Sequence, residues 1–146
     1  MAAYISRSPA DTEQAGEQLA RELRPGDVVA LFGDLGAGKT RFIRGLARGL
    51  GVTDPVSSPT FAIVHAYHGR IPLYHFDMYR IESWADLEST GFFDYLEDGG
   101  VCAVEWSENI EAALPENTVR VQIEPGEDLD TRRITITRGQ KEASGK

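Results

Sequence analysis

A short apolar run and the glycine-rich stretch after it decide the fold of this chain. Together they read VVALFGDLGAGKT and occupy residues 28–40. The run from Val28 to Phe32 is continuous rather than alternating, which predicts a buried central strand. After the glycines, apolar side chains recur at helical spacing at Phe42, Ile43, Leu46 and Leu50. Gly51 then stands where a helix ends, so the sequence predicts an amphipathic helix over about 39–50.

The stretch between the strand and the helix matches the pattern G-x-x-x-x-G-K-[ST]. Its glycines let backbone N–H groups point at phosphate oxygens, and the helix that follows adds the positive end of its dipole. Lys39 is predicted to reach the β- and γ-phosphates, and Thr40 to offer its hydroxyl to a bridging Mg²⁺. The residues predicted to bind the nucleotide here are Gly33, Asp34, Gly36, Ala37, Gly38, Lys39 and Thr40. The alternative is a glycine-rich turn with a surface lysine, which chance seldom sets between a buried strand and an amphipathic helix.

The rest of the chain predicts an α/β fold. Ser8 is a helix cap for a first helix over about 9–23. Further elements are predicted as strands over 61–69 and 71–80, short helices within 83–98, a buried strand over 100–106, a helical piece over about 108–114 and a hairpin of strands 117–123 and 131–137. This order favours a three-layer P-loop NTPase-like fold with a mixed, mostly parallel sheet and a C-terminal antiparallel hairpin. We expect one domain over 1–138 and a disordered tail over 139–146.

Two acidic residues come at the ends of predicted strands. Asp77 ends the run LYHFD and Glu105 ends the run VCAVE. Parallel strands present their carboxyl ends to the ligand crevice, so both acids are candidates for catalysis and for holding magnesium. Either one could instead be an ordinary surface acid. Thr60, in the loop SSPTF, is a candidate switch residue that senses the γ-phosphate, or else part of a Ser-Pro turn leading into a strand.

Charge and composition exclude several classes of function. The chain has 146 residues, with 15 basic and 23 acidic side chains and a net charge of −8, so non-specific binding to nucleic acid is not favoured. No apolar run approaches the ~18 residues of a membrane span and the N-terminus does not resemble a signal peptide, which predicts a cytoplasmic protein without a membrane partner. The single cysteine, Cys102, is predicted to be a buried small hydrophobe.

The remaining candidate residues have ordinary structural explanations. Strand alternation sends His65 and His68 to opposite faces, which argues against a zinc pair. His75 is predicted to be packed or hydrogen-bonded, and Trp106 to pack on the opposite side of its strand from Glu105. Three arginines recur opposite the apolar stripe of the second helix, where they form a solvated face or a docking surface: Arg41, Arg44 and Arg48.

The nucleotide is predicted to be ATP. Guanine-specific P-loop proteins normally carry N-K-x-D and D-x-x-G elements, and neither string occurs in this sequence. No lid or separate substrate pocket is evident, although a small-molecule kinase remains an alternative.

Five motifs resemble the bacterial TsaE (YjeE) family. They are GDLGAGKT, SSPTF, LYHFDMYR, STGFFDYL and AVEW, and the similarity runs from about Asp11 to about Trp106. The resemblance implies an ATPase that binds ATP and Mg²⁺ and supports turnover of the TsaB–TsaD pair, which forms N6-threonylcarbamoyladenosine in tRNA. Contact with tRNA would be indirect, through that complex. A nucleotide-gated regulatory module with negligible hydrolysis is the alternative.

The resemblance also implies roles for individual residues. Thr40 and Glu105 would be metal ligands, with Asp77 an essential acid near the metal, and Thr12 would help to bind the nucleotide. Arg41 stands where relatives commonly have a second threonine, and it can still contact a phosphate through its backbone N–H. Ser107 replaces a common proline after Glu-Trp, and the C-terminal third, with Arg132 and Arg133, matches only weakly.

Overall fold

The computed structural model describes residues 2–33, 36–53, 64–128 and 130–138. Its elements, in chain order, are β1 (Ala2–Ser6), α1 (Pro9–Ala20), β2 (Val28–Phe32), α2 (Gly36–Gly49), β3 (Val64–Tyr67), β4 (Leu73–Asp77), α3 (Trp84–Ser89), α4 (Phe92–Leu96), β5 (Val101–Glu105), the 3₁₀ helix η1 (Ser107–Ala113), β6 (Val119–Pro125) and β7 (Arg132–Arg138). The predicted tail and Thr60 lie outside the described residues. The single domain over 1–138 stays a prediction.

The described strands form one seven-stranded sheet in the order β1-β7-β6-β2-β5-β4-β3. The four central strands β6, β2, β5 and β4 pair in parallel, whereas β3 and β7 run against their neighbours. β1 pairs antiparallel with β7 and therefore runs in the same direction as the central strands. The predicted mixed, mostly parallel sheet and the C-terminal hairpin are confirmed.

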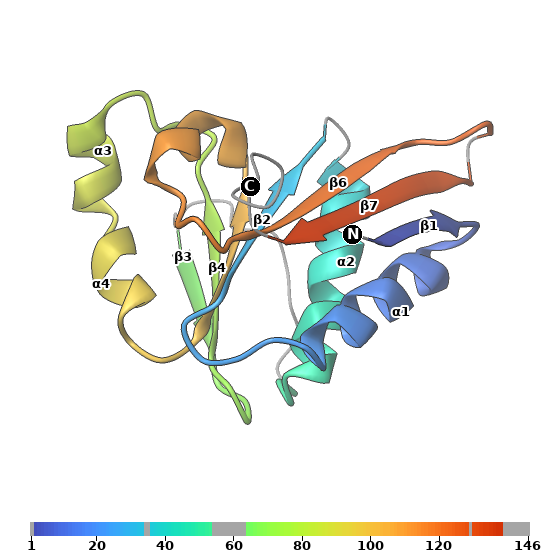
Figure 1. The fold of residues 1–146 in the computed structure, drawn as a ribbon, viewed down its shortest axis with the longest axis horizontal. Helices are drawn as coiled ribbons and strands as arrows, with labels where there is room; N and C mark the ends of the chain where they lie inside the picture. The colour runs from blue at the N-terminus through green and yellow to red at the C-terminus, as the bar shows by residue number, and fades with distance from the viewer. Residues whose placement is uncertain (1, 34–35, 54–63, 129, 139–146) are drawn as a thin grey trace.

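Helices cover both faces of the sheet and enclose two apolar cores (Figure 1). α1 and α2 pack on one face, where Phe42, Leu46 and Leu50 are fully buried. α3, α4 and η1 cover the other face around Phe76 and Phe92. This is the three-layer arrangement that the sequence predicts. Cys102 lies in the second core, where burial raises the pKa of its thiol to about 12, as expected of a small buried hydrophobe.

The N-terminal strand β1 was not predicted from the sequence. Its five residues, AAYIS, are too short and too mixed to stand out, and they become a strand by pairing with β7 from Ala2↔Ile136 to Ser6↔Arg132. The helix after it begins at Pro9, with Ser8 as its N-cap, as predicted. It ends at Ala20, three residues earlier than expected. β1 therefore tethers the start of α1 to the C-terminal hairpin.

The two helices on the phosphate-loop face approach each other closely. A Cβ on Gly45 of α2 would lie 1.7 Å from the carbonyl oxygen of Glu13 in α1, so only glycine fits there. Along the same contact, Arg41 Nη1 lies 2.8 Å and Arg48 Nη1 3.1 Å from the carboxylate of Glu13. Arg48 Nε also pairs with Glu17 at 3.1 Å. Arg41 and Arg48 on this helix face thus bind α1.

The Glu13 carboxylate is expected to make the stability of the fold depend on pH. Its hydrogen bond from Arg41 holds the pKa of Glu13 below its ordinary value of 4.5, with Arg48 adding to the effect. A carboxyl group whose pKa is depressed by folding stabilises the fold above the unfolded pKa, and this contribution is lost as the pH falls through the folded pKa. Because the ion pairs are partly exposed, the effect is small, about 0.5–1 kcal/mol.

We therefore expect Glu13→Gln to lower the free energy of unfolding at pH 7 and to have progressively less effect below about pH 4.5. Urea unfolding of both proteins between pH 7 and pH 3 measures this difference. Glu22→Gln, a change at an exposed glutamate just after α1, is the control and should leave stability unchanged. A Glu13→Gln effect of equal size at pH 3 and pH 7 would contradict the assignment.

Candidate functional site

The carboxyl ends of three neighbouring parallel strands form one edge of the sheet. β2 ends at Phe32 and leads into the glycine-rich loop, β5 ends at Glu105 and β4 ends at Asp77. In the sheet, β5 lies between β2 and β4, and Asp77 is the register partner of Glu105. The fold thus brings the loop and both predicted acids to the same edge, where α/β proteins of this kind bind ligands.

Gly33 makes the sharp turn out of β2. Its φ is +125°, a backbone angle that residues with a side chain rarely adopt. A Cβ there would lie 2.2 Å from the carbonyl oxygen of Ile123 in β6. The backbone of Gly36 and Ala37 then begins α2, followed by Gly38, Lys39 and Thr40 in the first turns. Asp34 lies outside the described residues. A helix N-terminus directly after such a turn favours anions.

Lys39 is held inside the site. Its side chain is 1% exposed, and Nζ donates a hydrogen bond to the carbonyl oxygen of Gly33 at 2.8 Å. The same Nζ lies 4.8 Å from the centroid of the Trp106 ring, within the range of a cation–π contact. A buried ammonium group with these two partners is positioned at the mouth of the loop rather than on the surface. The alternative of a surface lysine is therefore wrong.

Glu105 forms a buried pair with His75. His75 Nε2 lies 2.6 Å from Glu105 Oε2, and the two side chains are 0% and 7% exposed. With an ionised carboxylate at Glu105, which can only accept, the donor in this pair is His75 Nε2. His75 Nδ1 has no hydrogen-bond partner among the described residues. The prediction that His75 is packed and hydrogen-bonded is confirmed, and its contact fixes the orientation of the Glu105 carboxylate.

Asp77 is the more accessible of the two acids. It is half-buried, and its Oδ1 accepts a hydrogen bond from the backbone N–H of Tyr79 at 3.0 Å. The backbone N–H of Met78 in the same turn donates to the carbonyl oxygen of Glu105 at 3.0 Å. These contacts tie the ends of β4 and β5 together and leave the Asp77 carboxylate at the rim of the site.

Trp106 does not continue the strand, yet it packs against the second core together with Val104, on the side away from Glu105, as predicted. β5 ends at Glu105, and Trp106 has the left-handed backbone conformation, with φ +60° and ψ +41°. This turn brings its ring over Lys39 and within 4.8 Å of the ring of Tyr79. The alternation of side chains between the two faces of the sheet applies only within β5, and no pattern in the sequence marks the end of that strand.

A pocket of about 230 Å³ opens beside the loop, on the side away from the two acids. It is lined by Ser8, Pro9, Thr12, Gly38, Arg41, Asp130 and Arg132. Thr12 is 2% exposed, and its Oγ1 lies 2.6 Å from Ser6 Oγ. The pocket thus joins the start of α1, the loop and the start of β7. Thr12, which only the family resemblance singled out, lies next to the predicted phosphate loop.

Sequence reasoning missed two residues near the site. Arg132 lines the pocket, although its place in a predicted hairpin gave no reason to connect it with the loop. Glu108 lies at the other side, where its Oε2 accepts from the backbone N–H of Gly33 at 3.5 Å. Glu108 follows Trp106 by two residues, and the chain stays close to the site just after it leaves the edge of the sheet. This position in the sequence could have suggested Glu108 as a site residue.

The described residues fit Mg²⁺ only together with phosphate oxygens. Among them, no three histidine, cysteine, aspartate or glutamate side chains gather closely enough to hold a metal ion by themselves. Mg²⁺ usually takes one or two carboxylates, waters and substrate phosphates. The hydroxyl of Thr40 and the carboxylates of Glu105 and Asp77 offer such hard oxygen donors. The donor chemistry therefore fits a nucleotide-bound magnesium.

Comparison with known proteins gives a consistent result. A family model described as "Threonylcarbamoyl adenosine biosynthesis protein TsaE" matches residues 6–134. The tRNA threonylcarbamoyladenosine biosynthesis protein TsaE of Treponema pallidum is 43% identical over 132 residues, covering 90% of this chain and 97% of that protein. The protein of the same name from Bacillus subtilis is 45% identical over 131 residues, covering 89% of this chain and 81% of that protein.

A solved structure agrees with this match. The crystal structure of Bacillus subtilis YdiB superposes with a TM-score of 0.78 and 36% identity, covering 97% of this chain and 87% of that chain. The family match includes the loop, both strand-end acids and every residue that lines the pocket. On this evidence the chain belongs to the TsaE family.

Proposed function

We propose that this protein binds ATP with Mg²⁺ and hydrolyses it as part of the machinery that forms N6-threonylcarbamoyladenosine in tRNA. The observation that carries the proposal is the shared edge of β2, β5 and β4, where the loop lies beside two carboxylates in register. The relatives' names, which refer to tRNA threonylcarbamoyladenosine biosynthesis, support the pathway.

The loop supplies the contacts to the phosphates. Backbone N–H groups at the start of α2 would donate to the β- and γ-phosphates, and the ammonium group of Lys39 would exchange the carbonyl oxygen of Gly33 for a phosphate oxygen. This exchange replaces a neutral acceptor with a charged one, which makes the hydrogen bond of the ammonium group stronger. Thr40 would offer its hydroxyl to the metal, and the ring of Trp106 shields the ammonium group of Lys39 from water.

The two acids have different surroundings and therefore different tasks. Glu105, fixed by His75, would hold the metal, and Asp77 at the rim would accept a hydrogen bond from the attacking water. Bound Mg²⁺ would offset the charge that develops on the phosphates. The water oxygen bonds to the γ-phosphorus as the bond to the β–γ bridging oxygen breaks, and ADP leaves.

The pocket beside the loop is proposed to receive the nucleoside end of ATP. It begins at Gly38 and extends away from Asp77 and Glu105 toward Thr12. A triphosphate seated in the loop would therefore direct its γ-phosphate to the acids and its ribose and base to the pocket. The side chain of Arg41 is bound to Glu13 at 2.8 Å, so its backbone N–H is the group offered to a phosphate.

The proposed partner is the TsaB–TsaD pair, and the protein would contact tRNA only indirectly, through that complex. The family resemblance implies this partner, and the net charge of −8 gives the protein no general attraction for RNA. In the described part of the chain, no helix is both long and apolar enough to cross a membrane. A cytoplasmic location is part of the proposal.

Replacing Asp77 with alanine tests whether hydrolysis serves the function. We expect hydrolysis to fall about 10²-fold, since water loses its acceptor, and repeated tRNA modification by TsaB–TsaD to fall in parallel. Phosphate release and modified tRNA per complex are measured together, with ATP binding as the check on folding. Full modification without hydrolysis would instead support a nucleotide-gated regulatory module. Transfer of γ-phosphate to a metabolite would indicate a small-molecule kinase.

A further inference from the structure

The negative charge of this protein is concentrated in one segment. Between Arg80 and Arg120 the sequence has no lysine or arginine and ten acidic residues: Glu82, Asp86, Glu88, Asp94, Glu97, Asp98, Glu105, Glu108, Glu111 and Glu116. The other residues of the chain carry 13 acidic and 15 basic side chains, so they are slightly positive. This segment, with ten acids and no basic residue, therefore more than accounts for the net charge of −8.

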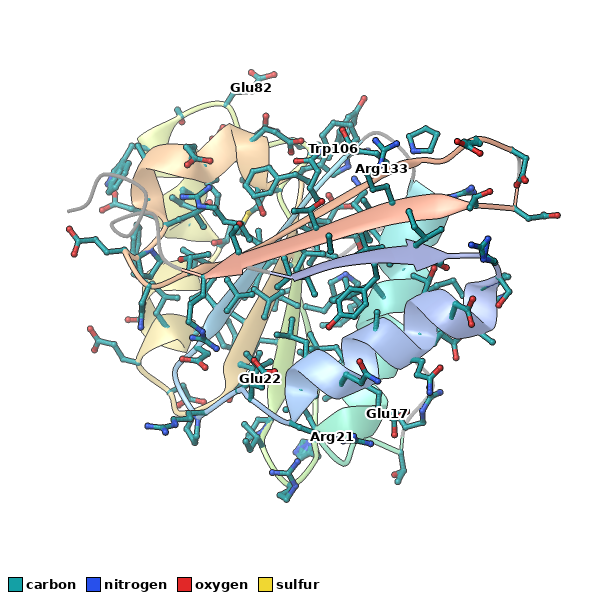
Figure 2. All side chains as sticks on the ribbon, turned by 45° about the vertical axis from the view of Figure 1, so that its right-hand side comes forward. Glu17, Arg21, Glu22, Glu82, Trp106 and Arg133 are labelled. Carbon is teal, nitrogen blue, oxygen red and sulfur yellow. The ribbon has the colours of Figure 1, made fainter. Side chains whose placement is uncertain are left out.

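The acidic segment forms one end of the molecule. α3, α4 and η1 gather there, at the opposite end from α1 (Figure 1). In Figure 2, Glu82 lies at the top of the molecule, whereas Glu22, just after α1, lies in its lower half. Apart from Glu105, which is buried in the site, none of these acids is in a strand. Glu111 is paired with Arg120 at 2.8 Å, and the other exposed acids give the end cap made by these helices a negative surface.

An apolar groove of about 200 Å³ lies within this surface, between α3 and η1. Its apolar lining includes Ile81, Trp84, Leu87, Ile110 and Ala113, and Glu82 is at its edge. Leu87 and Ile110 are buried beneath it, whereas the Trp84 side chain is 55% exposed. Tyr79, two residues before Ile81, is 60% exposed. Large exposed aromatic side chains beside an apolar hollow are typical of the centre of a protein interface.

The negative charge around the groove indicates which kind of molecule could bind there. Nucleic acid and anionic membranes are repelled by this surface, and a second copy of the same face would bring like charges together. A protein segment with an apolar side chain flanked by lysine or arginine matches both the hollow and its rim. We propose that the groove between α3 and η1 is the docking site for such a basic segment of the TsaB–TsaD pair. The identity of the pair rests on the proposed function, whereas the chemistry of the segment rests on the groove.

Contacts connect this groove to the nucleotide site. The ring of Tyr79 lies 4.8 Å from the ring of Trp106, which in turn lies 4.8 Å from Lys39 Nζ. Asn109 of η1 donates through Nδ2 to the carbonyl oxygens of Met78 at 2.8 Å and Tyr79 at 3.2 Å. The groove wall is therefore built on the same two strand ends that carry Asp77 and Glu105. A partner bound in the groove would therefore be linked to Lys39 through Tyr79 and Trp106.

Binding of purified TsaB–TsaD from the same organism tests the proposal. Glu82→Lys reverses the charge at the groove edge, and Trp84→Ser removes the exposed ring. We expect each to weaken binding at least tenfold by calorimetry in the presence of ATP and Mg²⁺. The matched control, Glu22→Lys, makes the same charge change at the opposite end and should stay within twofold of the wild type. Wild-type binding should weaken as salt is raised. ATP affinity and unfolding midpoints should remain as in the wild type for all three variants.

Several results would overturn the proposal. If Glu82→Lys and Trp84→Ser bind the pair as the wild type does, the groove is not the docking site, while the proposed function stands. Equal weakening by Glu82→Lys and Glu22→Lys would show only a general charge effect. A free-protein dimer that Trp84→Ser dissociates, or binding of tRNA alone that Glu82→Lys weakens, would assign the groove to another occupant. Failure of the wild type to bind the pair would overturn both this proposal and the proposed partner.

Discussion

Replacing Lys39 with alanine is expected to abolish measurable ATP hydrolysis, with a loss of at least about 10²–10³-fold in kcat. The ammonium group is the one cationic side chain among the described residues that lies within the loop, held between the Gly33 carbonyl and the Trp106 ring. Removing it leaves the charge of the γ-phosphate without its closest counter-charge as the transition state forms. Phosphate release under saturating ATP and Mg²⁺ measures this loss.

A second variant separates charge from packing at this position. Lys39 is 1% exposed, so alanine also leaves space in a buried region. Lys39→Met keeps most of the side-chain volume and removes the charge. We expect Lys39→Met to unfold close to the wild-type midpoint and to be as inactive as the alanine variant. Activity of Lys39→Met near the wild-type level would contradict the role given to the ammonium group.

Replacing Glu105 with glutamine is expected to weaken both magnesium binding and ATP hydrolysis. Glutamine keeps the shape of the side chain and can still accept the hydrogen bond from His75 through its carbonyl oxygen. It removes the negative charge that Mg²⁺ needs, so we expect the apparent magnesium affinity of the ATP-bound protein to fall at least about tenfold and hydrolysis about 10²-fold. Titration with Mn²⁺, followed by electron paramagnetic resonance, measures metal binding without relying on activity.

The control for this change is Glu108→Gln. Glu108 is also near the loop, accepting from the Gly33 N–H at 3.5 Å, but it belongs to η1 rather than to a strand end. Its replacement should leave Mn²⁺ binding within about twofold of the wild type, because an exposed charge is screened by solvent. Nucleotide binding without metal should be unaffected by Glu105→Gln. If both variants bind Mn²⁺ equally well, Glu105 is not a metal ligand.

The sequence predicted the parts of the fold that local patterns specify. The apolar run from Val28 to Phe32, the glycines after it and the helical spacing from Phe42 to Leu50 each indicate one element without reference to the rest of the chain. Asp77 and Glu105 were predicted to share an edge because both end apolar runs in a parallel sheet. Their register partnership follows from the order of β5 and β4, which the sequence does not show.

Features that depend on distant contacts were not predictable. β1 is a strand because β7 accepts it as a partner, and Arg132 reaches the pocket because β7 begins beside α1. The chain changes direction at Trp106, whose left-handed backbone conformation no local sequence pattern indicates. The pairing of His75 with Glu105 joins residues 30 positions apart. Each of these depends on tertiary packing, which overrides local propensity.

The most direct test of the central claim is the number of tRNA molecules modified per TsaB–TsaD complex in a reconstituted reaction containing the threonylcarbamoyl-adenylate donor, ATP and Mg²⁺. With the wild-type protein we predict many rounds of modification per complex, and with Lys39→Met no more rounds than in its absence. Equal numbers of rounds with the wild-type and Lys39→Met proteins would contradict the claim that this loop and its ATP serve that complex.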